Sequence, residues 1–192
     1  MSKYVWIYFY LTMAISVSVF GGYFDGATNV ALNGTATQNS INYGGVPARA
    51  IDGDTNGAWS GDSVTHTAFE AQPWWQVDLG DSYDIDEIVI WGRTDSSAAS
   101  RLSDYDVFIF DDSSQDPVWS NYQADYPDPM VSLNPGGIAG QYVVVQLRGT
   151  DALSLAEVQV YGTVVPEPAT LLLLGIGVVM MRRRKGVKTH HT

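Results

Sequence analysis

The sequence of 192 residues contains no cysteine. Disulfide bonds are therefore excluded, although they are the usual means by which small exported domains compensate for a limited core. A domain exported without them depends on core packing or on a bound ion for its stability. The hydrophobic share of 45% and the aromatic share of 12% are sufficient for one ordinary globular domain.

Positively charged residues are also few in the middle of the chain. Between residues 22 and 163 the chain has no lysine and only four arginines, against 20 aspartates and glutamates, and the formal net charge of the whole chain is -11. Such a surface repels phosphate backbones and favours cations, so we expect no nucleic acid partner. Because arginines are so few in this segment, each of the four needs its own explanation.

The N-terminus differs from the middle of the chain and is typical of an export signal. Lys3 precedes a largely apolar run, residues 4–20, and two glycines follow it. This order of charge, apolar core and small residues is that of a secretory signal peptide. We therefore expect residues 1–21 to be a signal helix that is removed on export, with an uncleaved membrane anchor as the alternative.

A second signal lies at the C-terminus. The tripeptide Pro166-Glu167-Pro168 precedes an apolar run of thirteen residues, which is predicted to be helical, and then three arginines and a lysine. The run is short for a permanent membrane span, and the basic cluster would stop transfer and stay in the cytoplasm. Together these features, within residues 164–188, resemble the PEP-CTERM sorting signal. The resemblance implies a bacterial protein that inserts transiently into the inner membrane, is recognised by an exosortase, and reaches the cell surface or the exterior.

The segment between these ends, residues 24–163, is predicted to be one all-β domain. Glycine and proline recur along it, and no long stretch has the spacing of an amphipathic helix. Short runs alternate apolar with other residues, which is typical of strands with one buried face. We expect a jelly-roll β-sandwich with functional loops at one end, and a variable surface connection over residues 111–135. The predicted strands are residues 74–79, 85–91, 105–110, 142–147 and 156–161.

Four sequence blocks in this domain resemble the discoidin-like, galactose-binding fold. They are residues 29–34, 48–53, 73–80 and 153–162, which occur in the right order and cover essentially the whole domain. The resemblance implies a galactose-binding-like β-sandwich, in agreement with the strand pattern. It also implies a binding module rather than an enzyme.

Within that fold, the segment 63–67 and the residues that follow it resemble the F-type lectins, or fucolectins. The family motif is a histidine, 26 residues, an Arg-x-Asp triplet, four residues and a basic residue. Here His66 is followed after 26 residues by Arg93 and Asp95, whereas the basic residue, Arg101, comes one position late. Two serines replace the adjacent cysteines that are common in this loop.

The resemblance implies that His66, Arg93 and Arg101 bind sugar hydroxyls. An arginine presents several donors in a planar fork, and a neutral histidine can donate to or accept from a hydroxyl. From the residues alone, the two arginines could instead form ion pairs with Asp95 or Asp104.

Aromatic residues are candidates for the apolar part of a sugar site. The methyl group of fucose needs an apolar wall, and Trp59, Phe69 and Tyr43 lie in predicted loops. Of these three we prefer Trp59. The adjacent Trp74 and Trp75 are predicted to be core and strand residues and not platforms on which a sugar stacks.

Acidic residues in a loop and in a strand indicate a cation. The loop 49–56 is rich in Asp and Gly, and Glu157 lies in an apolar strand, where an unpaired carboxylate would be costly. A hard cation would satisfy both, although an Asx-turn loop with Glu157 paired to Arg148 or Arg49 is the alternative. F-type lectins have such a calcium site, and the resemblance implies six ligand positions here. They are the carbonyls of Arg49, Asp54 and Ala156 and the side chains of Asp52, Ser63 and Glu157.

Two functions of different class remain. The first is a secreted, calcium-supported lectin that recognises fucose or related glycans and is associated with exopolysaccharide. The second is a non-catalytic structural or adhesive surface protein that has lost sugar binding, which the extra residue before Arg101 favours. An enzyme is not expected, because the chain has no phosphate-binding loop and no zinc motif, and His66 is its one histidine outside the C-terminal tail.

Overall fold

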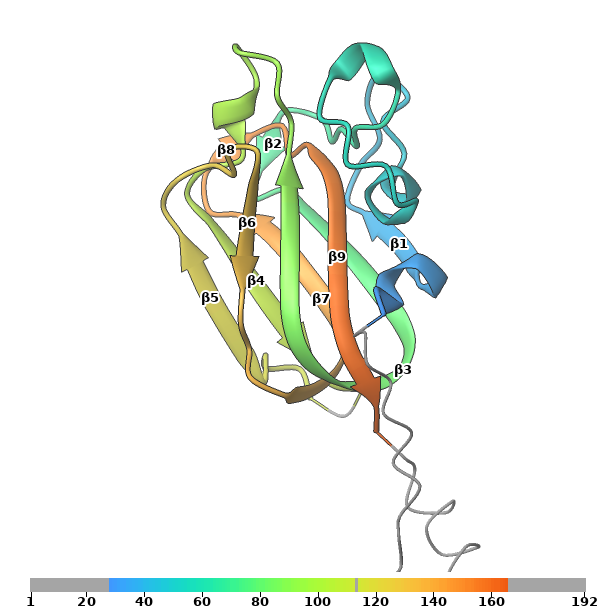
Figure 1. The fold of residues 1–192 in the computed structure, drawn as a ribbon. Helices are drawn as coiled ribbons and strands as arrows, with labels where there is room; N and C mark the ends of the chain where they lie inside the picture. Colours follow the sequence, from blue (N-terminus) through green and yellow to red (C-terminus); the bar gives the residue numbers. More distant parts are fainter. Residues whose placement is uncertain (1–27, 113, 166–192) are drawn as a thin grey trace, which may run out of the picture.

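A computed structural model of the chain describes residues 28–112 and 114–165. Over these ranges it forms a β-sandwich with four short 3-10 helices and no α-helix (Figure 1). The all-β prediction is therefore confirmed. No helix within the described ranges is long and apolar enough to cross a membrane.

The predicted export and sorting signals fall on other parts of the chain. The signal peptide (1–21), the C-terminal apolar helix, and the residues Pro166, Glu167 and Pro168 lie outside the described residues. The two flanking helices therefore stay predictions.

Nine strands make up the described sandwich. They are β1 (Thr35–Gln38), β2 (Glu70–Ala71), β3 (Trp74–Gly92), β4 (Tyr105–Phe110), β5 (Trp119–Gln123), β6 (Met130–Leu133), β7 (Ile138–Leu147), β8 (Thr150–Asp151) and β9 (Leu155–Val164).

The long strand β3 joins two layers. Its first part lies in a layer of order β1-β3-β7-β4-β5, and its second part pairs with β6 on one side and β9 on the other. The register against β7 shifts between Asp78 and Tyr83, where Gly80 has a φ of 85° that favours glycine. One continuous strand thus turns the corner between the layers and holds them together at the base of the sandwich (Figure 1).

The core lies between the layers, and its residues are the inward-facing side chains that alternate with outward-facing ones along each strand. Val107 and Ile109 of β4 and Val143 and Val145 of β7 are fully buried, and their neighbours along the chain are half-exposed. Because side chains alternate across a strand, each layer buries one face and leaves the other to solvent. The predicted strands 74–79 and 85–91 are the two parts of β3, and the other three predicted strands correspond to β4, β7 and β9.

The segment 111–135, predicted to be a variable surface connection, contains two strands that were not predicted. The segment contains β5, which pairs with β4, and β6, which pairs with β3. Both strands lie on edges, and their burial alternates only weakly, because polar residues such as Asn121 and Ser132 occupy positions within them. β5 has polar residues on both faces, and β6 is only four residues long, so neither strand has a long alternating hydrophobic pattern that would predict it.

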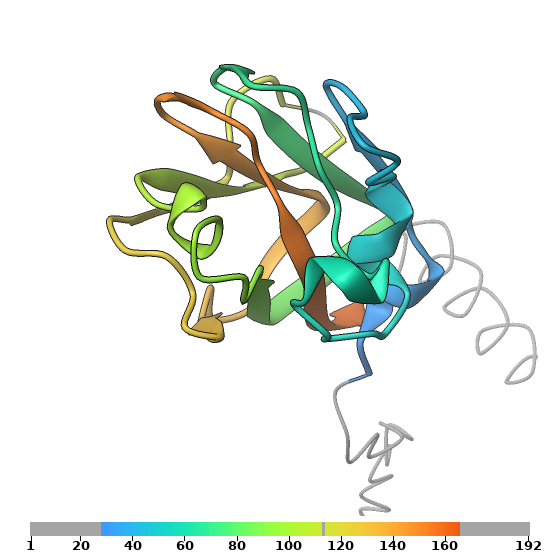
Figure 2. The same cartoon turned by 90° about the horizontal axis from the view of Figure 1, so that it is seen from above.

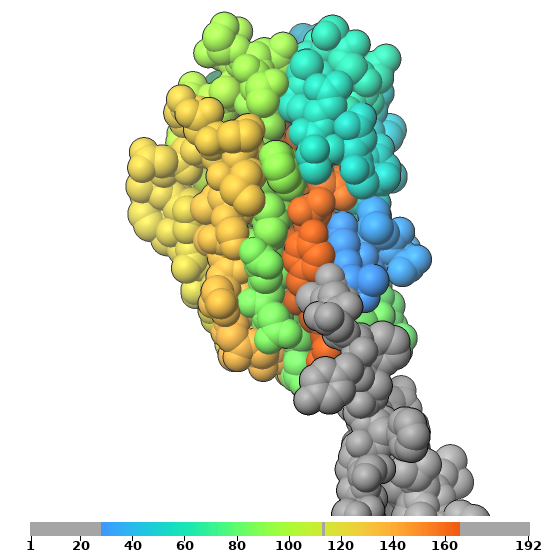
Figure 3. Space-filling model, in the orientation of Figure 1, coloured from blue at the N-terminus to red at the C-terminus, as the bar shows by residue number. Residues whose placement is uncertain are grey.

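The loops that connect the strands gather at one end of the sandwich. There the helices η2 (Pro47–Ile51), η3 (Trp59–Gly61) and η4 (Ala99–Arg101) lie near the short pair β2–β8, whereas β9 ends at the opposite end (Figures 1 and 2). Two loop regions stand side by side at the top of the space-filling view (Figure 3). The fourth helix, η1 (Val30–Asn33), packs against β9 and β3.

Trp75 connects the core to this loop end. Its side chain is fully buried, and its Nε1 donates a hydrogen bond of 3.0 Å to the carbonyl oxygen of Pro47 at the start of η2. Trp74, one residue earlier, is half-buried and points to the outer face of the layer. The two tryptophans therefore have different roles, and only Trp75 belongs to the core.

We expect this difference to appear in the stability of single variants. Trp75→Ala should lower the free energy of unfolding by about 3–5 kcal/mol, because it leaves a large cavity and an unpaired Pro47 carbonyl. Trp74→Ala should cost less than about 1 kcal/mol, because its ring lies at the surface. Urea denaturation of both variants measures the two values, and equal losses would contradict this placement of the rings.

Candidate functional site

A pocket of about 230 Å³ lies at the loop end of the sandwich. Its walls come from five segments: the turn after β1, the start of η3, the segment before β2, the residue after β3 and the end of η4. The side chains that line it are Tyr43, Trp59, His66, Arg93 and Arg101. The structure therefore brings together all four of the predicted sugar-binding residues, and it adds Tyr43.

The backbone of His66 is held on both sides. Its N–H donates to the carbonyl of Gly45 at 3.0 Å, and its carbonyl accepts from the N–H of Asn42 at 2.9 Å. A Cβ atom at Gly45 would overlap the backbone nitrogen of His66, so the close approach requires glycine. The imidazole is consequently placed by main-chain contacts and is only 5% exposed.

The hydrogen bond of the His66 ring determines which tautomer faces the pocket. Nδ1 lies 2.6 Å from the carbonyl oxygen of Thr67, which can only accept, so Nδ1 carries the proton in the neutral ring. Nε2 is then left with its lone pair. The pocket thus contains one acceptor from His66 beside the donors of two arginines.

The pKa of His66 is lowered from 6.5, chiefly because burial disfavours the imidazolium. The hydrogen bond to the Thr67 carbonyl acts in the opposite direction, whereas the positive charges of Arg93 and Arg101 lower the pKa further. The ring is therefore neutral at neutral pH, and its acceptor is available.

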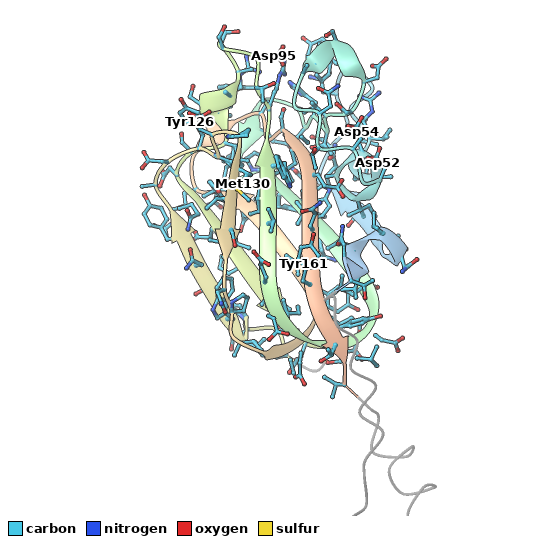
Figure 4. All side chains as sticks on the ribbon, in the orientation of Figure 1. Asp52, Asp54, Asp95, Tyr126, Met130 and Tyr161 are labelled. Atoms are coloured by element: carbon cyan, nitrogen blue, oxygen red, sulfur yellow. The ribbon has the colours of Figure 1, made fainter. Side chains whose placement is uncertain are left out.

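Arg93 is oriented by the third residue of its own motif. Its Nε donates to Oδ2 of Asp95 at 2.7 Å, and the same oxygen accepts from the backbone N–H of Trp59 at 3.0 Å. The ion pair lowers the pKa of Asp95. Because Nε of Arg93 is bonded to Asp95, the two Nη groups of the guanidinium can donate to a ligand in the pocket. Figure 4 shows Asp95 at the loop end of the sandwich.

Aromatic rings close the other sides of the pocket. The Arg93 guanidinium carbon lies 4.7 Å from the centre of the Trp59 ring. The rings of Trp59 and Tyr43 each lie 5.4 Å from the His66 ring and meet it edge to face. Tyr43 is 76% exposed and has a φ of 49°, so its turn presents the ring to solvent. Phe69, the third candidate wall, does not line the pocket.

Arg101 reaches the pocket despite its late position in the motif. It is the last residue of η4, a turn that takes up the extra residue. Its Nε lies 3.8 Å from Oδ1 of Asp151 in a half-exposed ion pair. Asp104, which was considered as its partner, instead accepts a hydrogen bond from the hydroxyl of Tyr122.

The acidic loop beside the pocket is a series of Asx turns. The side chain of Asp52 accepts from the N–H of Asp54 at 2.9 Å, that of Asp54 from Asn56, and that of Asn56 from Ala58. The hydroxyl of Ser63 donates to the Asn56 carbonyl. Ser63 therefore lies against the end of this loop.

Glu157 is a fully buried carboxylate under the same loop. Its Oε1 accepts from the N–H of Gly53 at 3.1 Å, but its Oε2 has no hydrogen-bond partner among the residues that the structure describes. Burial raises its pKa to about 7, and the charges of Asp52 and Asp54 add to the rise. Neither arginine considered as its partner contacts it: Arg49 bonds to the Val64 carbonyl and to Asp62, and Arg148 pairs with Asp106.

The six predicted calcium ligands lie on three segments. Arg49 is in η2, Asp52 and Asp54 follow it, Ser63 comes after η3, and Ala156 and Glu157 begin β9. The described ranges contain no group of three or more His, Cys, Asp or Glu side chains that could by themselves hold a metal ion. The predicted site contains two carboxylates, so carbonyl and hydroxyl oxygens would supply its other ligands. The buried Oε2 of Glu157, which has no hydrogen-bond partner within the described ranges, is an oxygen ligand of the kind that a hard cation takes.

The placement of His66 leads to a pH prediction. The folded protein binds the imidazole proton more weakly than the unfolded chain, so the His66 contribution to stability is lost as the pH falls below 6.5 through the folded pKa. Above 6.5 that contribution is constant. An NMR titration of the ring protons should show a pKa below 6.5 for the signal that disappears in His66→Gln. A value at or above 6.5 would contradict the burial of this ring.

The sandwich and the pocket between its loops define a galactose-binding-like domain, and comparisons with known proteins agree. A model of the NedA-like, galactose-binding domain of F5/8 type C matches residues 49–145. Fucolectin-1 of Anguilla japonica is 32% identical over 143 residues, which is 69% of this chain and 79% of that relative. The chain therefore belongs to the F5/8 type C galactose-binding family and, within it, to the fucolectins. A model of the PEP-CTERM protein-sorting motif matches residues 164–185, in agreement with the predicted signal.

Solved structures show the same relationship. A fucose-binding module of Streptococcus pneumoniae is 35% identical, with a TM-score of 0.66, and the match covers 70% of this chain and 97% of that module. The lectin domain of lectinolysin, solved with the Lewis B antigen, is 34% identical, with a TM-score of 0.68, and the match covers 70% and 96%. The predicted galactose-binding-like fold and the fucolectin resemblance are thus confirmed.

Proposed function

We propose that the protein is a lectin that binds fucose or a related sugar in the pocket between its loops. The observation that carries this proposal is the convergence of His66, Arg93 and Arg101 on one 230 Å³ pocket. The relatives named as fucolectins and fucose-binding modules support the choice of sugar.

The pocket suits a sugar because its polar groups are complementary to hydroxyls. A hydroxyl both donates and accepts, so one hydroxyl can donate to Nε2 of His66 while it accepts from an arginine. The rings of Trp59 and Tyr43 offer an apolar wall for a methyl group or for the C–H face of a sugar. The pocket lining contains no carboxylate. It therefore lacks the acidic pair that glycoside hydrolysis usually requires, which supports binding without catalysis.

Calcium is the second part of the proposal. Asp52 and Glu157 would hold the ion with their carboxylates, Ser63 with its hydroxyl, and Arg49, Asp54 and Ala156 with their carbonyls. The ion would supply positive charge to the unpaired Oε2 of Glu157 and would fasten the loop 52–56 to β9. Because the segment 63–67 continues from this loop to His66, the ion would also stabilise one side of the sugar pocket.

Export to the cell surface completes the proposal. Residues 1–21 would direct secretion, and the sorting motif would hold the protein transiently in the inner membrane until an exosortase acts on it. A lectin released there would meet the exopolysaccharide of its own cell. The acidic domain, with 20 acidic residues against four arginines between residues 22 and 163, suits neutral glycans.

Sugar binding is tested by titration calorimetry of the full chain with L-fucose and by a glycan array, each with calcium and with chelator. We expect binding to fucose or fucosylated glycans. His66→Ala and Arg93→Ala should each weaken it at least about tenfold, since each removes a polar contact worth about 1.4 kcal/mol or more. The matched control is Arg148→Ala, which removes an arginine paired with Asp106 outside the pocket.

Two outcomes decide between the lectin and the structural protein. Loss of binding in the pocket variants but not in Arg148→Ala supports the lectin. A folded protein with no signal on any glycan in either buffer would instead favour the structural or adhesive role, with the pocket as a remnant of ancestry.

Calcium binding predicts a specific pattern of thermal stability. Calcium at 100 times its Kd should stabilise the wild type by roughly 2.7 kcal/mol, or several degrees in the midpoint of unfolding. Glu157→Gln should abolish this increment, yet it should leave the stability in chelator unchanged or higher, because a neutral amide costs less to bury than a carboxylate. The matched control, Glu87→Gln, alters an exposed glutamate on the outer face of β3 and should keep the full increment.

The calcium proposal fails if chelator does not change the midpoint of the wild type. It also fails if Glu157→Gln responds to calcium as the wild type does. In either case Glu157 would be a buried acid that its raised pKa leaves partly protonated at neutral pH.

A further inference from the structure

The outer face of the layer β3-β7-β4 carries aromatic rings and amides where a solvated sheet face usually carries charged residues. Three cross-strand rows lie on it, because alternate residues of each strand point outward. The rows are Trp74–Gln146–Asp106, Gln76–Val144–Phe108 and Asp78–Tyr142–Phe110.

This face is hollowed along its length. One hollow, of about 360 Å³, is lined by Trp74, Phe108 and Phe110 together with glutamine side chains. A second, of about 450 Å³, continues from it and shares Gln76, Phe110 and Gln115 with it. Together they form an open groove along the strands that shares no residue with the loop pocket.

The aromatic rings of the groove are held in place by the sheet. Phe108 and Phe110 lie two residues apart on β4, with ring centres 6.0 Å apart. Trp74 begins β3, and its backbone N–H donates to Oδ1 of Asn39 at 3.0 Å. Aromatic side chains have few rotatable bonds, so rings on a regular backbone offer flat apolar surface at little entropic cost.

The amides of the groove are available for a ligand. Gln76 and Gln115 form no side-chain hydrogen bond within the part of the chain that the structure describes, and Gln146 donates only to the carbonyl of Gln72, at 3.3 Å. A primary amide has two donors and an acceptor, which match the hydroxyl groups of a sugar. Covering these amides with an apolar partner would leave them unsatisfied.

Charge excludes several kinds of occupant. No basic side chain of the described ranges lines either hollow, and Asp111 and Asp112 lie at the far end of the second. Arg148 lies beyond the groove lining, with both its Nε and its Nη2 bonded to Asp106. Anionic polymers would be repelled. A second copy of the chain placed face to face would bring two sets of these acids together.

We propose that this groove is a second carbohydrate site, which takes the interior of an extended, uncharged polysaccharide chain. The rings of Trp74, Phe108 and Phe110 stack on sugar faces, and the glutamine amides bind the hydroxyls between them. An open groove admits a chain of any length, whereas the loop pocket holds one sugar unit.

The proposal is tested by gel electrophoresis of the full chain through soluble polysaccharides. The neutral probes are hydroxyethyl cellulose, mixed-linkage β-glucan, galactomannan and xylan, and alginate is the anionic control. The His66→Ala/Arg93→Ala double variant removes the loop pocket, so that a failure of the proposed lectin site does not affect the result. We expect at least one neutral polymer to retard the wild type and the double variant alike, and alginate to retard neither.

Variants of the groove provide the second measurement. Trp74→Ala and Phe108→Ala should each raise the apparent Kd for the retarding polymer at least tenfold. The matched control, Tyr126→Ala, removes an aromatic ring that is 41% exposed and lies outside the groove, and it should have no effect. Gln76→Ala, which leaves every ring in place, should weaken retardation as well. This variant tests the groove if an aromatic variant fails to fold.

Three results would overturn the proposal. The first is that no neutral polymer retards the double variant, and the second is that Trp74→Ala and Gln76→Ala both bind as the wild type does. The third is a dimer, detected by sedimentation without any polysaccharide, that dissociates in Trp74→Ala, since the groove would then be covered by a second copy.

Discussion

The pairing of one short segment with the start of β9 positions both halves of the functional end. The backbone N–H groups of Thr65 and Thr67 donate to the carbonyls of Leu155 and Leu153, and the threonine hydroxyls accept from the backbone N–H groups of the same two leucines, all at 2.8–3.0 Å. Both threonines are fully buried. Such satisfied polar contacts in the interior specify a single arrangement of the chain.

Several site residues depend on this pairing. Ser63 precedes the two threonines and meets the acidic loop, whereas His66 lies between them and enters the sugar pocket. On the partner strand, Ala156 and Glu157 follow directly after Leu155. A shift of two residues between the segments would move the histidine and the buried carboxylate together. The proposed sugar and cation sites are therefore coupled by the backbone and not merely adjacent.

The strands were largely predictable from the sequence, but the contacts of the loops were not. Alternation in β4, β7 and β9 follows from burial on one face, which is a local property that the sequence records. β5 and β6 were not predicted because β5 has polar residues on both faces and β6 has only four residues. The motif spacing identified His66, Arg93 and Arg101, but the spacing alone could not show that η4 takes up the extra residue before Arg101. Nor could it show that the unpaired oxygen of Glu157 lies under the Asx turns, because such contacts join residues about a hundred positions apart.

The two proposed carbohydrate sites lie on different sides of the domain, and this arrangement determines how the protein would hold a glycan. The loop pocket lies at one end of the sandwich and β9, which leads to the sorting motif, ends at the other (Figure 1). The pocket thus lies at the opposite end of the sandwich from Val164, the last residue of β9. The groove runs along the strands of one layer and is open at the side. A pocket that takes one sugar unit and a groove that takes a chain do not compete for the same part of a polymer. Two weak contacts on one rigid domain raise the effective concentration of each for the other, so a single domain would gain avidity without forming an oligomer.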